Sequence, residues 1–148
     1  MGIDQDFKEF IELLNKHNVE YLVVGGYAVA MYGYPRYTGD IDFWVKPSTS
    51  NAKKIILALN DFGFGGYDIS ENDFCEVDNV VQLGYPPNRI DIITGVTSLN
   101  FDDCFLAKKN IEIENVTVNF ISLFHLRLNK SATGRDKDKN DLNNLPEK

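Results

Sequence analysis

Cysteine is scarce in this 148-residue sequence, which contains only Cys75 and Cys104, far apart and in no Cys-x-x-Cys pattern. Neither the spacing of zinc ligands nor the framework of a disulfide-rich secreted domain is present. We therefore expect two free thiols in a reducing compartment, which predicts a cytoplasmic protein. The acidic amino terminus also lacks the basic region and apolar stretch of a secretory signal, so none is expected.

Long apolar runs and an excess of positive charge are missing as well. The longest apolar candidate, residues 21–32, is interrupted by Gly25-Gly26 and falls short of the roughly 18–20 residues that cross a bilayer, so no membrane association is expected. Lysine and arginine number 15 against 22 aspartate and glutamate residues, a formal net charge of −7. Such a surface disfavours long nucleic acids but leaves room for a local basic pocket.

The sequence does have the composition of a folded domain, with 43% hydrophobic and 25% charged residues. Its length predicts that residues 1–148 form a single domain. Residues 67–78 give no clear prediction, whereas hydrophobic periodicity predicts helices and strands elsewhere. Helices are expected over 4–18, 27–32, 50–62, 101–108, 123–130 and 136–145, and strands over 20–24, 40–45, 79–83, 89–94, 111–113 and 116–121. These elements predict an α+β fold, a small mixed sheet flanked by helices.

The most informative stretch is residues 21–45, where a short strand runs into Gly25-Gly26 and then into a short helix. Glycines at such a turn allow the backbone to approach a ligand closely, and the start of a helix offers free N–H groups for phosphate. The same pattern is typical of a tight strand–helix turn that binds nothing. The two glycines alone leave both interpretations open.

Three aspartates lie on two of the predicted strands. Asp40 and Asp42 project from the same face of one strand, and Asp91 lies in a second apolar strand. Adjacent carboxylates repel each other, so they form either a solvated strand end or a divalent-metal site. Arg36 or Arg89 could be the partner of Asp91 if there is no metal. If the strands are neighbours, three carboxylates converge and can hold two metal ions for phosphoryl or nucleotidyl transfer.

The carboxyl-terminal region is locally basic. Lys130 and Arg135 are candidates to neutralise phosphate charge. The alternative is a solvated helix with internal ion pairs, Arg135 with Asp138 and Lys137 with Asp141, at helical spacing. The spacing by itself favours the solvated helix.

Taken together, three motifs resemble the nucleotidyltransferase superfamily related to DNA polymerase beta, and within it the minimal bacterial members, which include antitoxin-like and antibiotic-modifying proteins. In chain order the motifs are VVGGYAVAMYGYPRYTGDIDFWV, VVQLGYPPNRIDIITGV and NKSATGRDKDKNDLNNL. The likeness covers nearly the whole chain and is weakest over 63–78. It implies the polymerase beta-like fold and metal-dependent transfer of a nucleoside monophosphate from a nucleoside triphosphate to an acceptor hydroxyl, with release of pyrophosphate.

The resemblance also implies roles for the three aspartates. Asp40, Asp42 and Asp91 would be the catalytic residues and would hold Mg²⁺, with two ions expected. Asp91 would in addition be able to accept the proton of the acceptor hydroxyl.

For the nucleotide, the resemblance implies that Gly25 and Gly26 bring backbone amides to the triphosphate, and it favours Lys130 as a residue that neutralises its charge. Arg36, which precedes the Asp40-x-Asp42 strand, is a further candidate for this role, or else an ordinary solvated charge. Members of the superfamily commonly have serine directly after the first glycine. This chain has Gly26 there, followed by Tyr27. Tyr27 is therefore expected either to supply a hydroxyl to the nucleotide or to pack.

The departure at Tyr27 favours an alternative: a nucleotide- or protein-binding module with an antitoxin-like role and weak or no catalysis. Three converging carboxylates argue against this module, because a protein that transfers nothing has little need of them. An α+β domain with no ligand is a third possibility. The sequence does not identify the acceptor, which is a small molecule, a protein or an RNA end, and a partner protein or a homodimer could supply the surface that recognises it.

Overall fold

The computed structural model describes residues 3–34, 38–65 and 68–147. The strands are β1 (Tyr21–Val24), β2 (Asp40–Val45), β3 (Val80–Leu83), β4 (Arg89–Ile93), β5 (Lys109–Ile113) and β6 (Val116–Phe120). The helices are α1 (Gln5–Lys16), α2 (Gly25–Met31), α3 (Thr49–Phe62), α4 (Phe101–Leu106), α5 (Leu123–Thr133) and α6 (Asp136–Asn144).

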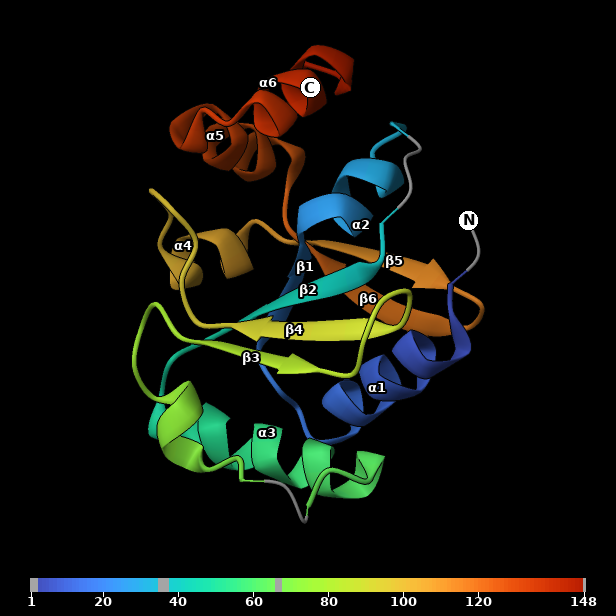
Figure 1. The fold of residues 1–148 in the computed structure, drawn as a ribbon, viewed down its shortest axis with the longest axis vertical. Helices are drawn as coiled ribbons and strands as arrows, with labels where there is room; N and C mark the ends of the chain where they lie inside the picture. Colours follow the sequence, from blue (N-terminus) through green and yellow to red (C-terminus); the bar gives the residue numbers. More distant parts are fainter. Residues whose placement is uncertain (1–2, 35–37, 66–67, 148) are drawn as a thin grey trace.

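The six strands form one mixed sheet in the order β3-β4-β2-β1-β6-β5. Helices cover both faces of this sheet, with α1 and α3 on one side and α2, α4, α5 and α6 on the other (Figure 1). The pairs β2–β4 and β1–β6 are parallel, and the remaining neighbours are antiparallel. The predicted α+β class and mixed sheet are therefore confirmed.

Differences from the predicted elements lie mainly at their ends. Helix α2 starts at Gly25, two residues earlier than expected, directly after β1. Strand β5 starts at Lys109, because its ladder with β6 extends to Phe120. Helix α5 continues to Thr133 and ends where Gly134 adopts a left-handed φ of 66°. The stretch without a prediction contains a short 3₁₀ turn, Glu71–Phe74.

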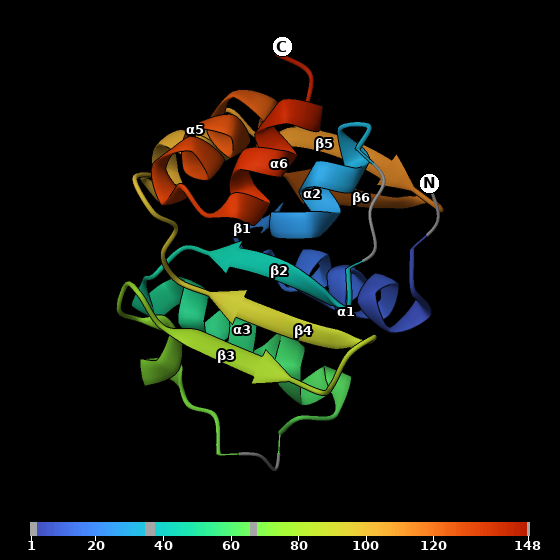
Figure 2. The same cartoon turned by 45° about the horizontal axis from the view of Figure 1, so that its top comes forward.

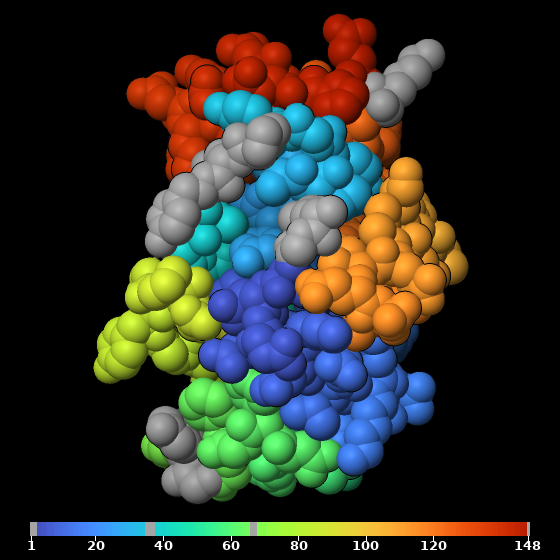
Figure 3. Space-filling view, turned by 90° about the vertical axis from the view of Figure 1, so that its right-hand side faces the viewer, coloured from blue at the N-terminus to red at the C-terminus, as the bar shows by residue number. Residues whose placement is uncertain are grey.

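Helix α1 covers the sheet face opposite the three aspartates. Its buried residues follow the spacing expected from the sequence, and Asp4 caps its start by accepting a hydrogen bond from the Asp6 amide at 2.9 Å. The ring of Phe10 meets that of Phe43 on β2 edge-on, with centroids 5.4 Å apart. In Figure 3 these amino-terminal residues, in dark blue, fill the space between the orange β5–β6 hairpin and green α3.

A buried side chain, Asn51, ties the first turn of α3 to the strands that carry the site. Its Oδ1 accepts a hydrogen bond from the Glu20 amide at 2.8 Å. Its Nδ2 donates to the carbonyls of Glu20 and Lys46, both at 3.1 Å. The start of β1 and the end of β2 are thereby held together, which helps to keep these two strands in register.

Helices α5 and α6 lie beside α2 on the face that carries the aspartates (Figure 2). Between them Lys130 Nζ lies 3.2 Å from Asp138 Oδ1 and 3.1 Å from Asp141 Oδ2. All three side chains are buried. The expected pair of Arg135 with Asp138 is present at 2.7 Å. The interpretation of this region as a solvated helix is nevertheless wrong, because Asp138 and Asp141 turn inward to a buried lysine.

Both cysteines are free thiols, as expected. Cys104 is buried, and burial together with the negative charge of Asp103 raises the pKa of its thiol to about 11. Little reactive thiolate therefore forms there at neutral pH. Among the residues that the structure describes, no helix combines the length and the apolar character that a membrane crossing requires.

Candidate functional site

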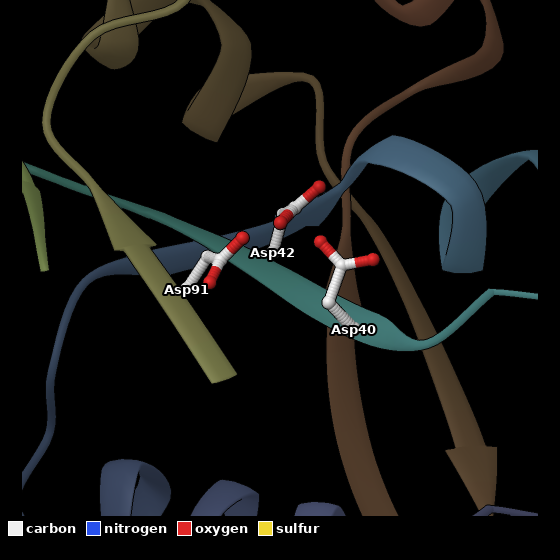
Figure 4. Close-up of side chains that lie close together, drawn as sticks. All are labelled: Asp40, Asp42 and Asp91. Atoms are coloured by element: carbon white, nitrogen blue, oxygen red, sulfur yellow. The ribbon is translucent and has the colours of Figure 1, made fainter. Parts of the chain in front are cut away.

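The three aspartates meet because β2 and β4 are parallel neighbours. Their register places Asp42 beside Asp91 and Asp40 beside Arg89. Side chains two residues apart on a strand share a face, so all three carboxylates project from the same side of the sheet (Figure 4). One oxygen from each carboxylate lies within 4.8 Å of the others. The convergence expected for neighbouring strands is therefore present.

Gly25 completes one wall of this cluster. The antiparallel pairing of β1 with β2 sets Val24 opposite Asp42, so the chain turns into α2 directly beside that carboxylate. Gly25 has a φ of +68°, and a Cβ at this position would lie 2.2 Å from Asp42 Oδ2. A side chain cannot fit there without moving the carboxylate. The Gly25-Gly26 turn and the Asp-x-Asp strand thus form one site.

Arg89 places a positive charge among these carboxylates. Its Nε donates to Asp91 Oδ1 at 2.9 Å, and its Nη2 donates to Asp91 Oδ2 at 3.0 Å. The same Nη2 also donates to Asp40 Oδ2 at 3.0 Å. Thr38 adds a hydroxyl hydrogen bond to Asp40 Oδ1 at 3.2 Å. One arginine therefore compensates part of the charge of three carboxylates.

Burial, hydrogen bonds and neighbouring charges together shift the pKa values of the three aspartates in different directions. Burial, and then the charges of Asp40 and Asp91, raise the pKa of Asp42 to about 8. Burial also raises the pKa of Asp91, against the opposing hydrogen bond from Arg89. Burial alone would raise the pKa of Asp40 too, but hydrogen bonds within the cluster and from Thr38, with the charge of Arg89, lower it overall. At neutral pH the metal-free cluster therefore retains a proton, which relieves part of the repulsion.

The donor set suits a hard divalent cation. Carboxylate oxygens are the protein ligands that Mg²⁺ prefers, and it commonly binds through one or two of them with the remaining positions taken by water and phosphate. Asp40, Asp42 and Asp91 offer such oxygens from two rigid strands. The partial compensation by Arg89 leaves negative charge that a cation would neutralise. The residues present therefore fit a magnesium site.

Of the other predicted site residues, Tyr27 and Lys130 contact groups outside the aspartate cluster, and Arg36 is not among the described residues. The ring of Tyr27 packs edge-on against Phe7, with centroids 5.5 Å apart, and burial and the charge of Asp4 raise its pKa. The ring of Tyr27 therefore packs, and a contact of its hydroxyl with the nucleotide stays a prediction. Lys130 lies in the buried ion cluster of α5 and α6, and no ion pair within the described ranges links it to the three aspartates.

Two contacts in the site could not be found from the sequence. The spacing of Arg89 and Asp91 indicated a pair on one strand, but the reach of Arg89 to Asp40 depends on the register between strands 49 residues apart. The hydrogen bond from Thr38 to Asp40 had no signal beyond proximity in the chain.

Comparisons with known proteins give the family of the chain and a solved structure with a similar fold. The model of a family described as "nucleotidyl transferase of unknown function (DUF2204)" matches residues 4–148. A candidate nucleotidyltransferase from Thermotoga maritima, known from its crystal structure, superimposes with a TM-score of 0.64, covering 93% of this chain and 88% of that chain. The sequence identity of 15% means that this likeness shows the fold alone. No curated protein matches the sequence.

Proposed function

The chain belongs to the nucleotidyl transferase family whose model spans residues 4–148, and from this premise we propose a Mg²⁺-dependent reaction. In it, a nucleoside monophosphate passes from a nucleoside triphosphate to an acceptor hydroxyl, and pyrophosphate is released. The observation that carries the proposal is the cluster of Asp40, Asp42 and Asp91 beside Gly25. The family supports nucleotidyl transfer in general, and we add to it the metal, the nucleoside triphosphate and the acceptor hydroxyl.

We assign the metal to the three aspartates, with two ions expected. Bound Mg²⁺ would neutralise phosphate charge and lower the pKa of the attacking hydroxyl. Asp91 is the residue to which we assign the proton of the acceptor. Its carboxylate is held in place by two hydrogen bonds from Arg89, at 2.9 and 3.0 Å. A base fixed in this way does not have to be oriented during the reaction.

The chemical change is one substitution at phosphorus. A bond forms between the acceptor oxygen and the α-phosphorus while the bond to the leaving pyrophosphate breaks, and the hydroxyl proton goes to Asp91. Such reactions depend mainly on positioning and charge neutralisation. Backbone amides at Gly25 and Gly26 are the groups that we assign to the triphosphate, because they lie where β1 turns into α2 beside Asp42.

We retain Arg36 and Lys130 as predicted contributors to phosphate binding. Lys130 already contacts two buried aspartates in the free protein. Its first role is therefore to hold α5 against α6, and contact with a phosphate stays a prediction.

The proposal is tested by incubating the protein with each α-³²P nucleoside triphosphate in cell extract, with and without Mg²⁺. We expect Mg²⁺-dependent transfer of label to a small molecule, a protein or RNA. In Asp42→Asn the rate should fall by about 100-fold or more, because a charged ligand at the reacting phosphate is lost. Asp103→Asn, which changes an exposed aspartate on α4, is the matched control. Undiminished label transfer by Asp42→Asn would contradict the proposal.

The second candidate is a nucleotide- or protein-binding module with an antitoxin-like role. The observation that favours it is the packing of Tyr27 on Phe7. Tyr27 follows the two glycines, and this contact turns its ring toward α1. The same experiment separates the two candidates when nucleotide binding is measured beside it. Measurable nucleotide binding with no labelled product would favour the module, and copurification would then be used to find a partner protein or a homodimer.

A further inference from the structure

Arg89 sits between two of the aspartates that we assign to the metal. A single nitrogen, Nη2, donates hydrogen bonds to Asp40 Oδ2 and Asp91 Oδ2, each at 3.0 Å. The Nε of the same guanidinium holds the remaining oxygen of Asp91 at 2.9 Å. Asp42 receives no hydrogen bond from this arginine. The guanidinium therefore bridges Asp40 and Asp91, which come from different strands.

The bridging position is one that a shared divalent cation would compete for. A metal bound by both carboxylates comes close to Asp40 Oδ2, which now accepts a hydrogen bond from Nη2, and two cations at such short range repel each other. The side chain of Arg89 is 30% exposed, whereas that of Asp91 is 8% exposed. The arginine thus has a route to solvent that the aspartate lacks. Asp40, whose side chain is 27% exposed, is held at Oδ1 by Thr38, so the longer side chain of Arg89 is the partner that moves away.

We propose that Arg89 is an internal counter-ion of the metal-free site, which a divalent cation displaces from Asp40 when it binds. In the absence of metal, the guanidinium holds Asp40 and Asp91 together and limits their repulsion. On binding, the cation takes over this role and the bond from Nη2 to Asp40 breaks. The inference rests on the proposed function, since it assumes that the aspartates bind a divalent cation.

The direction in which metal affinity changes when Arg89 is replaced distinguishes a displaced counter-ion from a residue that orients a metal ligand. Groups that orient a metal ligand strengthen metal binding, and their loss typically weakens it by about 10- to 100-fold. A positive charge that competes for the same oxygens weakens metal binding, so its removal strengthens it. Arg89 carries a full charge and spans two assigned ligands, which favours competition.

The test is calorimetric titration of the full chain with Mn²⁺ in the absence of nucleotide. Arg89→Gln keeps a hydrogen-bond donor and removes the charge, and we expect it to bind Mn²⁺ more tightly by about 5- to 150-fold, the usual range of coupling between two sites. Arg89→Lys keeps the charge and should bind within a few-fold of the parent. Arg135→Gln is the matched control, because it removes another arginine–aspartate pair, at 2.7 Å at the start of α6, and should leave the Mn²⁺ affinity unchanged.

A second readout is made on the parent protein, and the variants serve only to assign the signal. In the parent protein, the ¹⁵N signal of Arg89 Nε, identified by its absence from Arg89→Lys or Arg89→Gln, should shift as Mg²⁺ is added to saturation. An unmoved signal, or Mn²⁺ affinity that is unchanged or weaker in Arg89→Gln, would overturn the inference and leave the proposed function standing. If Mn²⁺ binds neither the parent nor any variant, both the inference and the metal-dependent reaction are wrong.

Discussion

Gly25 contributes to this site through the side chain that it lacks. The carboxylate of Asp42 occupies the volume where a side chain at Gly25 would begin. Residue 25 also has a φ of +68°, a conformation that costs most L-residues about 1–2 kcal/mol. Position 25 therefore needs glycine for two reasons: its backbone conformation is left-handed, and Asp42 leaves no space for a side chain. The two requirements can be separated experimentally.

Gly25→Ala should abolish divalent-metal binding and nucleotide transfer while destabilising the fold, because the new Cβ forces Asp42 out of place. Gly134→Ala is the control, since Gly134 has a φ of +66° and a Cβ added there would meet no atom within 4 Å. It carries the backbone strain without the collision and should lose only about 1–2 kcal/mol of unfolding free energy. Urea unfolding and Mn²⁺ titration of both variants check this. Equal metal affinity in the two would show that the collision does not matter.

Among the elements, the pair α5–α6 differs most from what its polar sequence indicates. A lysine and two aspartates are buried between the helices, and Arg135 joins the cluster from the surface. Buried ions of this kind stabilise a fold only while each remains paired, because an unpaired buried charge is costly. The attachment of the carboxyl-terminal helices should therefore depend on pH.

Asp138 sets the direction of that dependence. Burial alone would raise its pKa, but hydrogen bonds from Arg135, Thr133 and Lys130 outweigh burial and hold the pKa well below its usual range. A lowered folded-state pKa adds stability at pH values above the unfolded value of about 3.9, and this stability is lost as the pH falls toward the folded value. We expect the unfolding free energy to drop as the pH falls below about 4, as measured by urea unfolding.

Asp138→Asn should remove most of this stability already at pH 7, by about 3–5 kcal/mol, and should flatten the acid dependence. Asp136→Asn changes an exposed aspartate in the same helix and should stay close to the parent at both pH values. If the unfolding free energy of Asp138→Asn falls with decreasing pH as steeply as that of the parent, other carboxylates cause the acid dependence.

For the whole molecule, metal binding and folding are linked through the sheet. The aspartates are held by β2 and β4, which are central strands, and the metal-free cluster keeps carboxylates within 4.8 Å of one another. A cation that binds the folded state alone must stabilise it. Because the strands belong to one sheet, this stabilisation should appear in the global unfolding transition.

Mg²⁺ at about 100 times its Kd should add about 2.7 kcal/mol, which raises the Tm of a chain of this size by about 5–10 °C. The measurement is thermal unfolding with MgCl₂ and with NaCl at equal ionic strength, since the net charge of −7 responds to any salt. Asp42→Asn should show only the NaCl effect. An equal rise in the two salts would contradict specific binding.

The local features of this protein were already determined by its sequence. Apolar spacing predicted α1 and the strands, and the Asp-x-Asp spacing put Asp40 and Asp42 on one face, because both features depend only on neighbouring residues. Only the tertiary structure decided that Asp42 lies beside Asp91, that Arg89 reaches Asp40, and that Lys130 is buried with two aspartates. Strand order, register and helix packing join residues far apart in the chain, and no local pattern records those contacts.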